Sequence, residues 1–301
     1  MRLPTRTMSA LVVGAALLVC GCEAQVHSSP PEDTPQAPVV APPASLAPLP
    51  VAPPAAPLAG LDARMQEATA AAAEYGAQIE TVVLDRTTGQ VVSNGGGIQF
   101  PIASVAKLFI ADDLLLRAAE DGAPLSAADR ASLDSMLRSS DDGAAQTFWE
   151  RGGQNAILSR VVARYGLTGT TAPSNAHWDV TLSTASDLVR YYDMLLDGSG
   201  GLPRPQADII VGNLARSTPT GLDGYPQRFG IPDGLSGEPV AVKQGWFCCW
   251  GSGDQLHVST GIIGPERRYV MAISSLDPSG DAAAREHLTE AVETMFPGGK
   301  I

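Results

Sequence analysis

The chain has 301 residues, a net charge of −12 and 44% hydrophobic residues. This acidic balance argues against nucleic acid as a partner, because nucleic-acid-binding surfaces need clustered positive charge. Three of the twenty basic residues are lysines and the others are arginines, so the sequence uses arginine where only positive charge is needed. Lysine, unlike arginine, can release its proton at an accessible cost. Lys107 and Lys243 are therefore candidates for chemistry.

The first residues are typical of a bacterial secretion signal. Two arginines precede an apolar run, 8–19, that is shorter than the ~20 residues needed to span a bilayer. The run ends at Gly21-Cys22, which resembles a lipobox. We expect residues 1–21 to be cleaved and Cys22 to carry a lipid, which would anchor the protein outside the cytoplasm on the cell membrane. Plain secretion with cleavage elsewhere is the alternative.

Residues 22–58 are rich in proline, alanine and valine and carry almost no charge after Asp33. Such a segment cannot bury a core and is typical of an extended linker. At ~3.1 Å per residue it could reach roughly 100 Å. We expect a tether, although a spacer with no length requirement explains the composition equally well.

Residues 59–301 are long enough to bury one core, and we expect a single monomeric domain. Its only cysteines, Cys248 and Cys249, are neighbours, which can form a vicinal disulfide or stay free but provide no framework. The histidines are scattered, so we expect no metal and no cofactor.

The hydrophobic periodicity of this domain predicts both helices and strands. Helical patterns with caps and glycine stops predict helices at 61–75, 104–119, 126–138, 142–150, 156–165, 184–196, 206–216 and 281–296. Alternating patterns predict strands at 79–84, 90–92, 239–243, 255–263 and 268–275. These strands fit one five-stranded antiparallel sheet, with the terminal helices on one face and the middle helices forming a second lobe. The fold class is therefore α+β, an αβα sandwich.

Ser104 and Lys107 are three residues apart in a predicted helix, which places their side chains on one face. At the helix N-terminus, the macrodipole disfavours the ammonium form of Lys107 and favours a developing oxyanion. This pattern is typical of a serine nucleophile with a lysine base. Alone it is weak, because about one chance match is expected in a chain of this size.

Two later elements offer partners for this pair. Ser140, in Ser-Ser-Asp-Asp-Gly, precedes a predicted helix, and its hydroxyl could relay a proton, although Ser140 or Asp142 acting only as a helix cap explains the element as well. Lys243, at the end of a strand, could attract a substrate carboxylate or could simply guard an edge strand against aggregation. Gly245 would let a substrate approach the strand edge closely.

In this order, the three elements match the S-x-x-K, S-D-N and K-T-G motif set of penicillin-recognising serine enzymes. Residues 84–89 leading to 100–107 resemble the hairpin that runs into the nucleophile helix of class A β-lactamases, and 179–184 resembles the end of their Ω-loop. The resemblance covers residues 62–296. It implies the β-lactamase/transpeptidase-like fold.

The resemblance also implies a role for each candidate residue. Ser104 would be the acylated nucleophile, Lys107 its base, and Ser140 the group that passes the proton. Lys243 would assist Ser140 and the substrate carboxylate. The backbone N–H groups of Ser104 and Trp246 would form the oxyanion hole. The implied substrates are β-lactams or D-Ala-D-Ala-like peptidoglycan peptides.

Two site residues depart from the family pattern. Asp142 stands where the pattern has asparagine, so it would favour the charged form of Lys107 and lacks an amide donor for substrate. Gln244 replaces the threonine or serine after the motif lysine, and it could still donate to a carboxylate from a longer arm. Both residues are expected to contact substrate.

A third departure concerns deacylation. The loop 168–178 contains no acidic residue, which leaves His177 and Asp179 as the nearby titratable candidates. The spacing of 36 residues from Ser104 to Ser140 is short and implies a reduced helical lobe. We expect acylation with slow deacylation, as in a D,D-peptidase or a weak β-lactamase.

Two classes of function fit these observations. The first is a serine acyl-transfer enzyme, which the retained lysine pair favours, because a pure binding protein has no need of a deprotonatable lysine beside a serine. The second is a catalytically degenerate envelope module that binds cell-wall peptide or a protein partner, which the three departures favour. An esterase with the same machinery would instead turn over simple esters without affinity for penicillin.

Overall fold

The computed structural model describes residues 58–301, so the predicted signal, Cys22 and the tether lie outside the described residues. Within the described part, no helix combines the length and the apolar character that crossing a bilayer requires.

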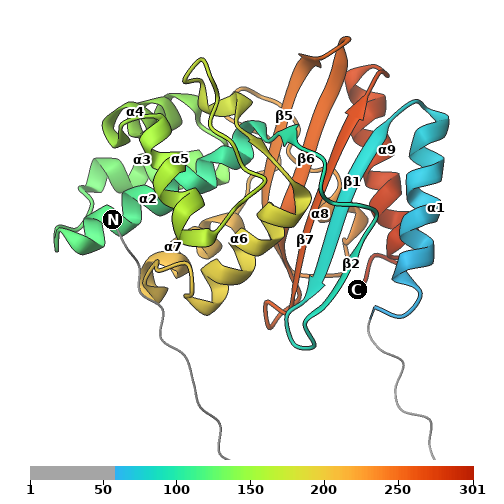
Figure 1. The fold of residues 1–301 in the computed structure, drawn as a ribbon, viewed down its shortest axis with the longest axis horizontal. Coiled ribbons are helices and arrows are strands. Elements are labelled where there is room, and N and C mark those ends of the chain that lie inside the picture. Colours follow the sequence, from blue (N-terminus) through green and yellow to red (C-terminus); the bar gives the residue numbers. More distant parts are fainter. Residues whose placement is uncertain (1–57) are drawn as a thin grey trace, which may run out of the picture. The chain divides into compact units, whose positions relative to one another are not determined.

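A five-stranded antiparallel sheet forms the centre of the domain, as the sequence predicts (Figure 1). Its strand order is β2-β1-β7-β6-β5, so the N-terminal hairpin joins the three C-terminal strands through β1 and β7. The bounds are β1 Gln78–Asp85, β2 Gln90–Ser93, β5 Val240–Trp250, β6 Asp254–Ile263 and β7 Tyr269–Asp277. A separate short pair joins β3 Phe100–Pro101 and β4 Leu182–Ser183.

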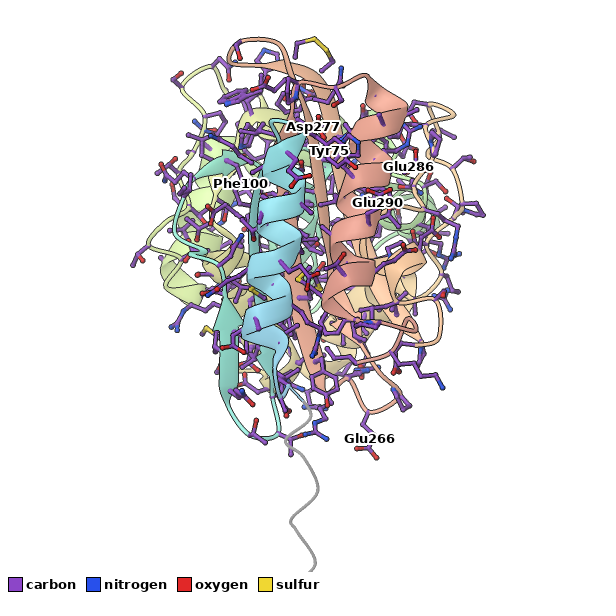
Figure 2. The ribbon with its side chains drawn as sticks, turned by 90° about the vertical axis from the view of Figure 1, so that its right-hand side faces the viewer. Tyr75, Phe100, Glu266, Asp277, Glu286 and Glu290 are labelled. Carbon is purple, nitrogen blue, oxygen red and sulfur yellow. A yellow bond between two sulfur atoms is a disulfide. The ribbon has the colours of Figure 1, made fainter. Side chains whose placement is uncertain are left out.

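Two long helices, α1 Leu61–Glu74 and α9 Asp281–Met295, lie side by side over one face of the sheet (Figures 1 and 2). Tyr75, just after α1, stacks on His287 of α9 with ring centroids 3.8 Å apart. Successive strand residues face opposite sides of a sheet. Accordingly, Val83 joins the core beneath these helices, whereas Val82 joins the core on the other face.

The other face of the sheet packs against a helical lobe. The lobe and its connections comprise η1 Ala103–Ala106, α2 Lys107–Glu120, α3 Ala127–Arg138, α4 Asp142–Gly152, α5 Asn155–Tyr165, η2 Trp178–Val180, α6 Ala185–Asp197 and α7 Arg204–Leu214. A short helix, α8 Ile231–Gly234, lies on the α9 side. α2 is buried over its first nine residues, which makes it the central helix of the lobe.

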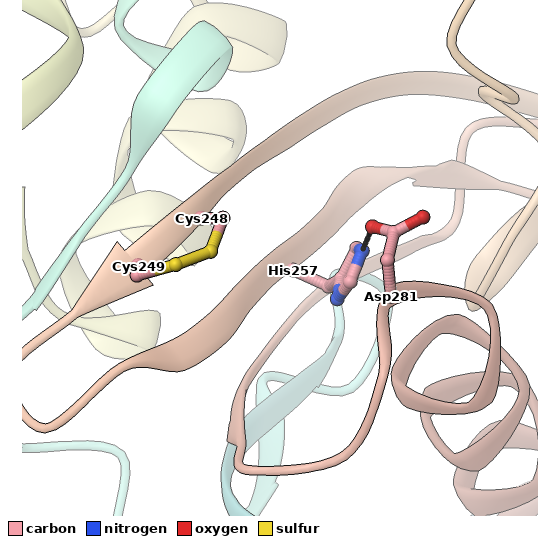
Figure 3. The surroundings of a disulfide bond; sticks show 4 residues. All are labelled: Cys248, Cys249, His257 and Asp281. Atoms are coloured by element: carbon pink, nitrogen blue, oxygen red, sulfur yellow. Dashed lines mark ion pairs between the residues drawn. A yellow bond between two sulfur atoms is a disulfide. The ribbon is translucent and has the colours of Figure 1, made fainter.

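Two local details differ from the sequence predictions, and a third decides between alternatives that the sequence left open. The nucleophile segment begins as the 3₁₀ turn η1, and the α-helix starts only at Lys107. β5 is 11 residues long and continues to Trp250, because it pairs with β6 along its length. Cys248 and Cys249, near the end of β5, form a vicinal disulfide (Figure 3).

Candidate active site

Four side chains that are far apart in the sequence meet where η1, α2, α4 and β5 converge. Lys107 Nζ lies 2.8 Å from Ser104 Oγ and 3.1 Å from Ser140 Oγ. Lys243 Nζ lies 2.9 Å from the same Ser140 Oγ. A continuous chain of hydrogen bonds therefore runs from Ser104 through Lys107 and Ser140 to Lys243.

The local backbone holds the two serines in place at a cost. Ala103, immediately before Ser104, has φ of 46°, and Ser140 has φ of 56°. Non-glycine residues in this left-handed region cost of order 1 kcal/mol each, and such strain persists where the surroundings enforce it. Backbone strain of this kind is typical of functional sites, so its presence at both serine-bearing turns supports a functional role for the cluster.

The helix cap beside Ser140 comes from a residue that sequence reasoning passed over. Asp141 Oδ1 accepts a hydrogen bond from the backbone N–H of Ala144 at 3.0 Å and caps α4. The capping interpretation of Ser140 and Asp142 is therefore wrong, and both side chains turn towards Lys107 instead. The sequence holds two adjacent aspartates, and only the backbone geometry tells which of them caps.

Lys107 is completely buried, and oxygen atoms surround its amine. Besides the two serine hydroxyls, Nζ donates to Ser140 O at 2.7 Å and lies 2.5 Å from Asp142 Oδ1. The Trp178 ring centroid is 4.8 Å away. Burial lowers the pKa of Lys107 from its ordinary value, and the Asp142 carboxylate acts in the opposite direction.

Lys243 is equally buried but has fewer partners. Its Nζ contacts Ser140 Oγ and, at 3.1 Å, the backbone carbonyl oxygen of Gln244. Burial first, and the charge of Lys107 second, hold the pKa of Lys243 well below its ordinary value.

Gly245 lies against the turn that carries the nucleophile. A Cβ at this position would lie 2.6 Å from Ile102 O and 3.3 Å from Ser104 N. Glycine is thus required so that β5 can approach η1, and its contact with a substrate stays a prediction. This approach brings the next residue, Trp246, beside the turn, and its ring stacks on Tyr225 with centroids 4.6 Å apart.

The structure does not bring Gln244 to the cluster. Neighbouring strand residues point to opposite sides. Lys243 faces the serines, while the Gln244 amide donates to Phe229 O at 2.7 Å. The side chain is 1% exposed, and its Oε1 has no hydrogen-bond partner among the described residues. The expected contact between Gln244 and substrate is therefore not supported by this geometry.

The loop 168–178 contributes an aromatic ring to the cluster, and sequence reasoning missed it. Trp178 is 7% exposed and covers Lys107, whereas His177 is exposed and Asp179 is partly buried. A tryptophan at the end of a polar loop was the available signal. A pocket of about 410 Å³ lies along this loop, lined by Ala172, Pro173, Ser174, Asn175, Val180, Leu182 and Trp250.

Two further residues beyond those predicted act on the cluster. Asp223, in the exposed loop after α7, adds negative charge that raises the pKa of both Lys107 and Lys243. Tyr225, in the same loop, supports the Trp246 ring. No group of three or more potential metal-ligating side chains gathers anywhere in residues 58–301.

Comparison with known proteins gives the family. Proteins named "Putative lipoprotein LppW" from Mycobacterium bovis and Mycobacterium tuberculosis are 54% identical to the chain over 315 residues, covering 99% of both sequences. The chain belongs to the LppW lipoprotein family. No protein-family model matches it.

Solved structures give the fold of this LppW-family chain. The TLA-3 extended-spectrum β-lactamase matches with a TM-score of 0.66 at 13% identity, covering 78% of the chain and 98% of the enzyme. A class A β-lactamase from Mycobacterium abscessus matches with a TM-score of 0.60 at 21% identity, covering 77% and 97%. The domain therefore has the class A β-lactamase fold, as the sequence motifs indicate.

Proposed function

We propose that this protein is a serine acyl-transfer enzyme of the β-lactamase/D,D-peptidase type. Its substrates would be β-lactams or D-Ala-D-Ala-like peptidoglycan peptides, and Ser104 would carry the acyl group. The observation that supports this most strongly is the buried chain of contacts Ser104–Lys107–Ser140–Lys243.

The chemistry follows from these contacts. The Ser104 Oγ attacks the substrate carbonyl carbon and forms a new C–O bond with it. Lys107 takes the Ser104 proton in the same step. The backbone N–H groups of Ser104 and Trp246 stabilise the resulting oxyanion. As the C–N bond breaks, the Ser140 hydroxyl protonates the leaving nitrogen. Lys243, which carries a proton at this stage, then restores the Ser140 proton, and Lys107 keeps the proton taken from Ser104.

Slow deacylation is part of the proposal. Hydrolysis of the ester needs a base that directs water at it. The loop 168–178 offers no carboxylate, and the side chain that it places against Lys107 is the Trp178 indole. Ser104 would therefore hold its acyl group for long periods.

The proposed domain organisation puts this chemistry in the cell envelope. Residues 1–21 would be a cleaved signal, Cys22 a lipid attachment site, 22–58 a tether and 59–301 the enzyme. The name of the LppW relatives, which includes the word lipoprotein, supports an anchor on the outer side of the cell membrane. The environment of that location would supply peptidoglycan peptides.

Intact-protein mass spectrometry after incubation with a penicillin tests the proposal. The full-length protein is expected to gain the mass of one drug molecule, and the Ser104→Ala variant is expected to gain nothing. Decay of the adduct over hours, followed in the same samples, measures deacylation. No adduct at millimolar drug would overturn the proposal.

The second candidate is a binding module with the same fold. The Lys107–Asp142 ion pair and the inward-facing Gln244 favour it, because both remove groups that a substrate would use. It predicts that cell-wall peptide binds equally to the wild-type protein and to Ser104→Ala without forming an adduct. Turnover of a simple ester without a penicillin adduct would point to an esterase instead.

A further inference from the structure

The Ser140 hydroxyl lies between two buried lysine amines. Its Oγ is 3.1 Å from Lys107 Nζ and 2.9 Å from Lys243 Nζ, so the two nitrogens are at most about 6 Å apart. Two ammonium groups this close would repel each other in a buried site, where little water screens them. The hydroxyl proton of Ser140 also needs an acceptor, and within residues 58–301 its Oγ contacts only these two amines.

The surroundings of the two amines differ. Lys107 Nζ lies within 3.1 Å of four oxygen atoms, one of them the Asp142 carboxylate, and faces the Trp178 ring. Carboxylates and aromatic faces both favour a cation. Lys243 Nζ contacts only one hydroxyl and one carbonyl oxygen of the described residues. The Gln244 carbonyl oxygen can accept a hydrogen bond from the amine, and the Ser140 hydroxyl can donate one to it. Such a pair of contacts suits a free amine.

We propose that the two lysines share one proton at rest, with Lys107 as the ammonium and Lys243 as the free amine, and that Asp142 sets this distribution. The free amine of Lys243 then accepts the hydrogen bond of Ser140. This arrangement gives the Ser140 proton an acceptor, and one N–H of Lys243 donates to the Gln244 carbonyl oxygen.

The charges that face the cluster agree with this distribution. Asp141 and Asp142 at the start of α4, and Asp223 in the loop after α7, raise the pKa of Lys107. Asp142 and Asp223 act in the same direction on Lys243, but only Lys107 has a carboxylate in contact with its amine. Burial lowers the pKa of both lysines, and the charge of Lys107 lowers that of Lys243 as well.

The arrangement gives Lys243 a part in acylation as a proton store, a role that rests on the proposed function. Lys107 gives a proton to Ser140 Oγ as Ser140 gives its own to Lys243, which leaves Lys107 free to take the proton of Ser104. After the Ser104 oxygen has bonded to the carbonyl carbon, the C–N bond breaks. Ser140 protonates the leaving nitrogen and regains a proton from Lys243. The resting charges are then restored.

Nuclear magnetic resonance of lysine labelled at Cε and Nζ tests the proton distribution directly. The chain has three lysines, and Lys300 is exposed and serves as an ammonium reference. Lys243→Arg and Lys300→Arg variants assign the signals by their disappearance. At pH 7 the full-length protein is expected to show Lys107 at the ammonium position and Lys243 at the amine position.

The Asp142→Asn variant is expected to exchange these two states. Asp223→Asn is the matched control, since it removes the same charge without removing a contact with Lys107, and it should leave both signals in place. Two ammonium signals in the wild-type protein, or an Asp142→Asn spectrum like that of the wild type, would overturn the proposal. The spectra require no substrate, so a missing penicillin adduct would refute only the proposed function.

Discussion

Lys107 Nζ lies 2.5 Å from Asp142 Oδ1, although the Lys107 side chain is 0% exposed and the Asp142 side chain is 72% exposed. The Asp142 side chain is therefore largely in solvent, while one of its carboxylate oxygens contacts the buried Lys107 amine at the edge of the cluster. On the proposed proton distribution, removing Asp142 would change the charge state of the buried amine, and its exposure means that the core would stay intact. This makes position 142 the most informative place to alter the site.

We expect Asp142→Asn to accelerate acylation by penicillin about tenfold at neutral pH. The Asp142 carboxylate raises the pKa of Lys107, so its removal increases the fraction of free amine. Because the Asp142 side chain is largely exposed, we expect a modest gain in rate. Stopped-flow measurement of adduct formation checks this, with Asp223→Asn changing the rate less than about twofold. A slower Asp142→Asn variant would contradict a restraining role for the ion pair.

We expect Ser140→Ala to slow acylation by about 10²–10⁴, the usual contribution of a positioned proton-transfer group. Ser140 has φ of 56°, a strain that alanine does not relieve and glycine does. Ser140→Gly should therefore be more stable than Ser140→Ala by about 1 kcal/mol while being equally slow. Chemical denaturation compares the two variants. Near-normal acylation in either would show that the Ser140 hydroxyl carries no proton.

The Gly245→Ala variant should lose both stability and acylation. Its Cβ would lie 2.6 Å from Ile102 O, so β5 must move away from η1, which would disturb the proposed oxyanion hole. Overpacking of this kind costs about 1–3 kcal/mol. Gly212→Ala is the control, because its Cβ would meet only the Arg216 side chain at 3.8 Å, within helix α7. Thermal unfolding and adduct formation test both variants, and an unimpaired Gly245→Ala protein would contradict the close approach.

Folding stability should fall as the pH drops from about 6.5 to about 4. Burial lowers the pKa of His257 to about 4, so the unfolded chain binds a proton in this window and the folded chain does not. The loss is of order 3 kcal/mol, from ~1.4 kcal/mol for each of about 2.5 pH units. His257→Gln should remove this part of the pH dependence in urea denaturation, whereas substitution of the exposed His177 should not. If the unfolding free energies of the wild type and His257→Gln changed with pH in the same way, the role of His257 in this pH dependence would be refuted.

The same His257 connects the sheet to the edge of the site. Its Nε2 lies 2.6 Å from Tyr225 OH and 3.5 Å from Asp281 Oδ1 (Figure 3), and the Tyr225 ring supports Trp246. Protonation of His257 would place a charge on β6 opposite Trp246 of β5, the residue that we propose contributes to the oxyanion hole. Penicillin acylation should therefore decline together with stability below about pH 5.

Much of the fold could be predicted from the sequence, because alternating and helical hydrophobic patterns report directly on burial. The length of β5 could not, since Gly245 and the paired cysteines interrupt its pattern and only pairing with β6 extends it to Trp250. The side on which Gln244 faces depends on how β5 meets η1, which no local pattern encodes.

In the candidate site, too, the sequence predicts some residues, whereas others depend on how the chain folds. Serine and lysine types at suitable spacings mark Ser104, Lys107, Ser140 and Lys243, and the structure brings these four together. The position of Trp178 over Lys107 depends on the path of a loop, and loops carry little periodic signal. Sequence reasoning therefore found the polar groups of the site and missed the ring that covers them.

The burial of Lys107 and Lys243 leaves Lys300, near the C-terminus, as the accessible lysine of the described chain. Amine-reactive dyes, biotin or surface-coupling reagents should therefore attach to one lysine of this domain. Lys300 lies outside the cluster, so a tagged or immobilised domain would keep its candidate site open.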